Sequence, residues 1–186
     1  MTRLLRAACC VLREPLTQHP TPNTQHAARN PRLLFIAYGN TLRRDDGAGL
    51  VLAEKVLPLL CNQGFQVELV AVQQLTPELA LTIADPNLTA VYFFDTAADP
   101  HPPAIQIHEI GSTQTAPVLG HHLIPSALLL YAKRLYAVCP PAWLVTIPGH
   151  DFALGEGFSV TTASHLADVG PLAQQLVQIT TQVDRL

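Results

Sequence analysis

The feature that most constrains this chain is the stretch from Leu33 to Val56, which reads LLFIAYGNTLRRDDGAGLVLAEKV. An apolar run typical of a buried strand ends at Gly39 and Asn40, and an amphipathic helical pattern follows from Ala48. A strand that passes through a glycine-containing turn into a helix is the first half of a βαβ unit. This stretch therefore predicts a parallel sheet covered by helices.

The rest of the chain continues this alternation. Thr76 stands before Pro77, and this pair is typical of a helix N-cap followed by the first helical residue. Strands alternating with helices predict the α/β class, as a three-layer α/β/α sandwich with a mostly parallel, twisted central sheet. The expected elements are strands over 67–72, 90–94, 143–147 and, more weakly, 105–110, and helices over 73–84, 123–135 and 166–176.

The N-terminal segment differs in composition from the rest. Residues 1–31 are rich in Arg and nearly free of acids, and their second half is rich in Pro, Thr, Asn and Gln. An organellar transit peptide can look like this, but a disordered tail or a mis-assigned start fits better. We therefore expect an N-terminal extension over 1–31 and a single domain over 32–186.

Charge, hydropathy and cysteine usage exclude several classes. Residues 33–186 carry six basic and thirteen acidic side chains, a net charge of −7, which disfavours binding to nucleic acid. No uninterrupted apolar run reaches the roughly 18 residues of a membrane span, so we expect no membrane association. The four cysteines form no C-x-x-C pair, which indicates neither a zinc framework nor a disulfide scaffold and fits the cytoplasm.

The turn from Gly39 to Gly49 lacks both common phosphate-binding patterns, G-x-G-x-x-G and G-x-x-x-x-G-K-[ST]. It carries Asp45 and Asp46 instead, which suit the positive end of a helix dipole but would repel a phosphate. We expect Asp45 to cap the following helix. Asp46 would then be free to face the crevice above the sheet.

Asp95 ends the apolar run AVYFFD. Ligands of open α/β sheets bind beyond the carboxyl ends of the strands, and a charge at such a position must be solvated, paired or used. A functional role is one interpretation. The other is that Thr96 or a nearby backbone amide satisfies the carboxylate.

The histidines offer a nitrogen ligand for the same edge. His121 and His122 stand at the start of the helix expected from Leu123, and His150 follows a predicted strand. Two carboxylates and one imidazole suit a borderline divalent metal with open positions. No G-x-S-x-G motif is present, and no serine or cysteine has an evident base, so covalent catalysis is unsupported.

Five blocks of the sequence carry a family resemblance. In chain order they are GNTLRRDDGAG, QQLTPELA, YFFDT, LGHHLIPSALLLYAKRLY and AWLVTIPGHDFALGEGFS, which span about residues 33–165. Together they resemble the [NiFe]-hydrogenase maturation endopeptidases. The first block is the most specific.

The resemblance implies an endopeptidase that removes the C-terminal extension of a hydrogenase large-subunit precursor after nickel insertion. It implies no cofactor of the enzyme's own, because the nickel is carried by the substrate. Three side chains would recognise that nickel, and by motif position they are Asp46, Asp95 and His121; the two aspartates are also the candidate catalytic residues. QQLTPELA and AWLVTIP look closest to the branch that serves bidirectional, NAD(P)-linked hydrogenases. We expect a monomer.

Three alternatives remain open at this point. The same residues could serve a non-proteolytic nickel-binding chaperone. The turn could belong to a nucleotide-binding Rossmann-like enzyme, although its two aspartates argue against this. The chain could also be another α/β hydrolase or peptidase that acts on a different metalloprotein.

Overall fold

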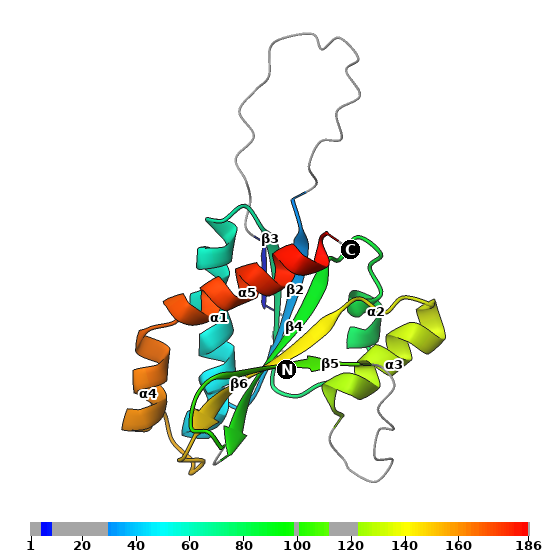
Figure 1. The fold of residues 1–186 in the computed structure, drawn as a ribbon. Coiled ribbons are helices and arrows are strands. Elements are labelled where there is room, and N and C mark those ends of the chain that lie inside the picture. The colour runs from blue at the N-terminus through cyan, green and yellow to red at the C-terminus, as the bar shows by residue number, and fades with distance from the viewer. Residues whose placement is uncertain (1–4, 9–29, 99–100, 112–122, 186) are drawn as a thin grey trace.

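The computed structural model describes residues 5–8, 30–98, 101–111 and 123–185 of the chain. Six strands form one sheet in the order β1-β3-β2-β4-β6-β5 (Figure 1). The four central strands run parallel to one another, and the two edge strands run antiparallel to their neighbours. The strands are β1 (Leu5–Ala8), β2 (Arg32–Tyr38), β3 (Gln66–Val72), β4 (Ala90–Ala98), β5 (Gln106–Ile110) and β6 (Ala142–Gly149).

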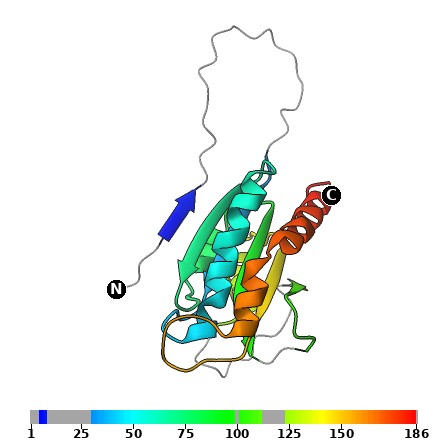
Figure 2. The same ribbon diagram turned by 90° about the vertical axis from the view of Figure 1, so that its left-hand side faces the viewer.

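Helices cover both faces of the sheet, as Figures 1 and 2 show. One face packs against α1 (Ala48–Cys61), α4 (Val160–Ala167) and α5 (Gly170–Val183). The other packs against α2 (Leu79–Ile83) and α3 (Pro125–Tyr136). The predicted three-layer α/β/α sandwich with a mostly parallel sheet is thereby confirmed.

The central strands form because nearly every side chain in them is buried on one face or the other. Leu33, Phe35 and Ala37 of β2 face α1, whereas Leu34 and Ile36 face α2 and α3. All five are at most 1% exposed, which explains why the sequence shows a continuous apolar run and no alternation. β5 is only half-buried at the sheet edge, in agreement with its weaker pattern.

The N-terminal extension contributes to the sheet, contrary to our expectation. Leu5–Ala8 pair with the outer edge of β3 over the register from Leu5 opposite Ala71 to Ala8 opposite Glu68. An antiparallel strand can close an open edge of this kind through backbone hydrogen bonds alone, so charge and composition gave no sign of it. The boundary of the single domain at residue 32 otherwise stays a prediction.

Two helices differ from their predicted form. The amides of Leu79 and Ala80 donate to the carbonyl oxygens of Thr76 and Pro77 in a tight turn, so α2 begins only at Leu79 and Thr76 does not cap it. The segment 166–176 contains a break. α4 ends at Ala167, the backbone of Asp168 is extended, and α5 begins at Gly170 with a proline in its first turn.

The strand order reverses at β2. α1 leads from β2 to β3 on one side, and α2 leads from β3 to β4 on the other side of β2 and on the opposite face of the sheet. The carboxyl ends of β2 and β4 therefore flank a topological switch point, where open α/β sheets bind their ligands. None of the described helices is both long and apolar enough to cross a bilayer.

Candidate active site

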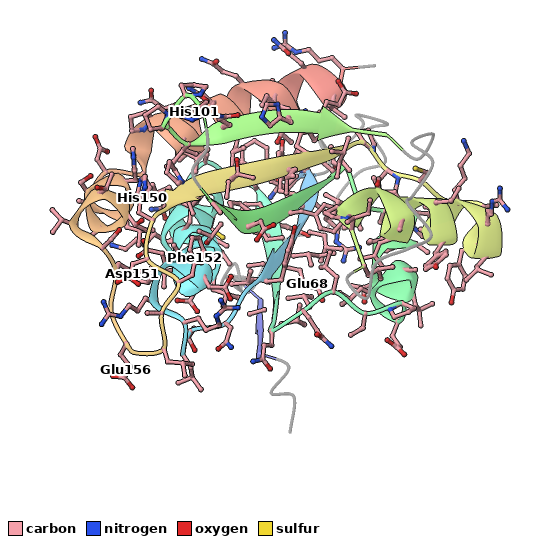
Figure 3. The ribbon with its side chains drawn as sticks, turned by 90° about the horizontal axis from the view of Figure 1, so that it is seen from below. Glu68, His101, His150, Asp151, Phe152 and Glu156 are labelled. Atoms are coloured by element: carbon pink, nitrogen blue, oxygen red, sulfur yellow. The ribbon has the colours of Figure 1, made fainter. Side chains whose placement is uncertain are left out.

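The switch point is lined first by the turn after β2. Figure 3 looks onto this side of the sheet. The turn leads into a 3-10 helix, η1 (Arg44–Gly47), which holds the Asp45-Asp46 pair, and α1 follows directly. Asp46 is half-buried, and its Oδ2 accepts a hydrogen bond of 3.0 Å from the amide of Asn40. This bond orients the Asp46 carboxylate toward the start of the same turn.

Gly39 permits the turn to close on η1. Its φ of +146° is in the region that favours glycine, and a Cβ atom there would lie 2.0 Å from the carbonyl oxygen of Asp46. Any side chain at residue 39 must therefore displace the backbone of Asp46.

We expect Gly39→Ala to lower the free energy of unfolding by about 2–3 kcal/mol, because backbone strain and a backbone clash act together. Gly64→Ala is the matched control, since Gly64 has a φ of +90° but open space around the added Cβ, and it should lose only about 1 kcal/mol. Urea denaturation of the two variants gives the comparison. Equal losses would show that the contact with Asp46 is unimportant.

Asp95 approaches the switch point from β4. The prediction that it ends its strand is wrong, because β4 continues to Ala98 along β6. Pairing of β2 with β4 stops at Ala37 opposite Phe94, however, so Asp95 is the first residue beyond that pairing. The backbone of Asp95 is thus unpaired on the β2 side, while it remains paired with β6 on the other side.

The surroundings of Asp95 are unusual for a carboxylate. Its Oδ1 accepts a hydrogen bond of 2.8 Å from the amide of Thr96, which was the alternative to a functional role. Burial raises the pKa of Asp95 above its ordinary value; hydrogen bonds from the Tyr38 hydroxyl and the Thr96 amide lower it, and the charge of Asp46 raises it. Asp46 and Asp95 are therefore close enough to repel each other.

Tyr38, the last residue of β2, is a member of this site that the sequence reasoning missed. Burial, and then the charge of Asp95 and a hydrogen bond to it, raise the pKa of Tyr38 well above its ordinary value. The tyrosine therefore stays neutral and offers its proton to the Asp95 carboxylate. A hydroxyl at the end of a buried strand is the signal that could have found it, by the argument already applied to Asp95.

The start of α1 packs directly on the backbone of Asp95. A Cβ atom on Gly49 would lie 2.9 Å from both the Cα and the nitrogen of Asp95. The Gly49 amide donates to the Thr96 hydroxyl at 3.1 Å. This close approach, which only glycine allows, joins the turn that carries Asp46 to the strand that carries Asp95.

The expectation that Asp45 caps α1 is wrong. The N-cap residue of α1 is Gly47, which has no side chain to accept a hydrogen bond from the first helical amides. The Asp45 side chain points to the loop after β6, where it is fully buried and gathers several donors. These are the amides of His150, Asp151 and Ser159 at 2.9, 3.0 and 2.7 Å, and the hydroxyls of Ser159 and Thr162 at 2.6 and 3.0 Å.

These donors determine the charge state of Asp45. Burial disfavours the ionised carboxyl, but the hydrogen bonds from the Ser159 hydroxyl and from the amides of His150, Ser159 and Asp151 outweigh burial and hold the pKa of Asp45 well below its usual range. The Thr162 hydroxyl also lies 2.8 Å from the carbonyl oxygen of Pro148, which competes for its single proton. Asp45 is thus ionised at neutral pH and joins η1 to the loop after β6.

Backbone and ionic contacts strengthen the same junction. The amide of Arg44 donates to Gly155, and the amide of Gly155 donates to Leu42, at 3.2 and 3.0 Å. The Arg44 guanidinium forms an ion pair with Asp151. In Figure 3 the loop that holds Asp151 and Phe152 lies beside the start of α1. The two loops, 39–47 and 149–159, therefore form one braced unit.

The structure does not describe the predicted third ligand. His121 and His122 lie outside the described residues, whose chain resumes at Leu123. Leu123 packs against the same cluster as Tyr38, on the sheet face toward which Asp95 also points. Among the described residues, no three His, Cys, Asp or Glu side chains gather closely enough to hold a metal ion. His150 is exposed, and its amide binds Asp45.

The arrangement brings together an ordered carboxylate, a second carboxylate in a partly apolar environment and a neutral phenol. Two such carboxylates can share a cation or a proton, and either can accept a proton from water. Arg32 forms its ion pair with Asp85, and Arg44 forms its ion pair with Asp151. Neither of these arginines therefore neutralises Asp46 or Asp95. The site therefore favours a cationic or electrophilic group over an anion.

Comparisons with known proteins bear on the fold. No protein-family model matches the chain, and no curated protein sequence does. Among solved structures, the [NiFe] hydrogenase maturation protease HycI from Thermococcus kodakarensis KOD1 is 19% identical, with a TM-score of 0.58 over 83% of this chain and 95% of that chain. The maturating endopeptidase HybD from E. coli is 19% identical, with a TM-score of 0.57 over 81% and 93% of the two chains. The chain has the fold of these hydrogenase maturation proteases.

Proposed function

We propose that this chain is an endopeptidase that removes the C-terminal extension of a [NiFe]-hydrogenase large-subunit precursor after nickel has been inserted. The observation that supports the proposal is the packing of the turn that carries Asp46 on the strand that carries Asp95, where the Thr96 hydroxyl lies 3.5 Å from the carbonyl oxygen of Asp46. Since both solved structures named above are hydrogenase maturation proteases, the fold supports the same class of activity.

Nickel enters this proposal as part of the substrate. Asp46, Asp95 and His121 would contact it, and a divalent cation between the two carboxylates would replace their repulsion with attraction. Three such ligands without a cysteine thiolate should bind free nickel or zinc weakly. Binding becomes strong only when the precursor brings the metal on its own ligands, so that affinity reports whether insertion is complete.

The hydrolysis itself needs a base and an activated carbonyl. Asp46 or Asp95 accepts a proton from a water molecule, whose oxygen attacks the carbonyl carbon of the scissile bond. The C–N bond then breaks, and the leaving amine takes up the proton that the carboxylate received. The substrate's nickel can polarise the carbonyl. Tyr38 holds the Asp95 carboxyl group in place by its hydrogen bond.

Finer features of the proposal follow from the sequence alone. We take the substrate to be the precursor of a bidirectional, NAD(P)-linked hydrogenase, on the strength of the blocks at 73–80 and 142–148. We take the enzyme to act as a cytoplasmic monomer, without a cofactor of its own.

The test is cleavage of purified precursor with and without nickel. We expect the nickel-loaded precursor to lose a short C-terminal peptide, seen by mass spectrometry, and the nickel-free precursor to stay intact at the same enzyme concentration. Binding of the loaded precursor without release of a peptide would indicate the chaperone alternative. Equal cleavage of both forms would remove nickel recognition from the proposal.

A further inference from the structure

Four large apolar side chains are exposed on the braced loops and at the first residue of α4. Leu42 is 61% exposed, Leu154 83%, Phe158 36% and Val160 88%. We call these four residues the apolar platform. Single exposed apolar residues are ordinary, but a group of them on adjoining segments with a polar border is typical of a protein-binding surface.

Hydrogen bonds bring the segments of the platform together. The carbonyl oxygen of Leu42 accepts from the amide of Gly155, which places Leu154 next to the turn after β2. Ser159 stands between Phe158 and Val160, and both its amide and its hydroxyl are held by Asp45. The four residues therefore stand on segments that are held against each other, although they lie up to 118 positions apart in the chain.

The same contacts keep the platform from collapsing. Because Asp45, Arg44 and the backbone of Gly155 fix both loops, the loops cannot fold over to bury these side chains on their own domain. A surface held in its binding conformation loses little conformational entropy when a partner docks, so rigidity here favours association.

We propose that the apolar platform docks the folded body of the large-subunit precursor while its C-terminal segment occupies the Asp46-Asp95 site; this inference rests on the proposed function. We choose the precursor as the occupant because the platform adjoins the turn that carries Asp46. Leu42 stands four residues before Asp46 in a turn that the Asn40 amide closes on the Asp46 carboxylate, so a large protein whose chain reaches Asp46 would lie beside the Leu42 end of the platform. A second copy of this chain on the platform would cover that turn. Exposed Arg43 and Glu156 supply the polar border.

The test compares two double variants of the full chain on nickel-loaded precursor. Leu154→Ser with Val160→Ser should raise KM about tenfold or more and leave kcat within twofold, because the reacting groups are untouched. Leu81→Ser with Leu135→Ser is the matched control. These two leucines are 64% and 69% exposed on α2 and α3, outside both braced loops, and their loss should leave KM unchanged.

Affinity for the precursor, measured with the cleavage-deficient Asp46→Asn background, separates docking from chemistry. In the Asp46→Asn background, Leu154→Ser with Val160→Ser should raise the Kd for the precursor by the same factor as it raises KM. This binding measurement does not depend on cleavage. An unchanged affinity, or an equal loss in the control pair, would overturn the docking surface and leave the proposed activity intact. Sedimentation that shows a wild-type dimer dissociated by the platform variant would also overturn it, in favour of self-association.

Discussion

Replacing Asp46 or Asp95 by Asn should lower the rate of precursor cleavage by about 100- to 10,000-fold, the usual loss when a general base or a metal contact is removed. His121→Ala should lose activity to a similar extent if it is the third contact to nickel. The measurement is single-turnover release of the C-terminal peptide from nickel-loaded precursor, followed by mass spectrometry.

The same variants should remain folded. Asp95 is a half-buried carboxyl group whose ionised form is disfavoured by burial and by the charge of Asp46, so its neutralisation should change the free energy of unfolding by less than about 1 kcal/mol. Asp184→Asn, at an exposed position at the end of α5, is the activity control and should cleave like the wild type. Normal processing by all three site variants would refute the site assignment.

Asp45→Ala should lower the free energy of unfolding by about 3–5 kcal/mol and inactivate the enzyme indirectly. Removing the carboxylate leaves the amides of His150, Asp151 and Ser159 without their acceptor in a buried place, and each such donor costs about 1–3 kcal/mol. Chemical denaturation measures the loss. Asp45→Asn should also be destabilised, because its NH2 group would face donors. A loss below about 1 kcal/mol in both variants would contradict the brace.

Acid should reveal the same interaction. The folded-state pKa of Asp45 lies below its unfolded value of about 3.9, so its stabilising contribution is complete above that pH and declines as the pH falls toward the folded-state pKa. The stability difference between the wild type and Asp45→Asn should therefore shrink below about pH 4. A difference that stays constant down to pH 2 would show that the carboxylate charge is not involved.

Much of the architecture could be predicted because the central strands are buried on both faces. Continuous apolar runs such as that of β2 leave few alternatives, and the carboxyl-end rule then directs attention to Asp46 and Asp95. The break between α4 and α5 could have been predicted from Gly170 and the proline that follows it. It was missed because the helical spacing of apolar residues continues across the break.

The role of Asp45 could not be predicted in the same way. Its partners lie 105 to 117 positions away, and three of them are backbone amides, which any residue type supplies. Helix-start statistics therefore suggested a local cap, and tertiary contacts decided otherwise. The close approach of Gly49 to Asp95 could not be predicted either, because only the folded structure shows which backbone segment the glycine contacts.

The long sequence separation within the Asp45 network has a consequence for biosynthesis. The turn after β2 leaves the ribosome early, but it receives its anchoring donors only after β6 and the start of α4 have been translated. Closing a loop of more than a hundred residues carries an entropic cost that no local contact offsets, so nascent chains stopped before position 159 should lack the contacts that hold the Asp45 turn in place. The proposed site is therefore complete only after the segment up to Thr162 has been translated.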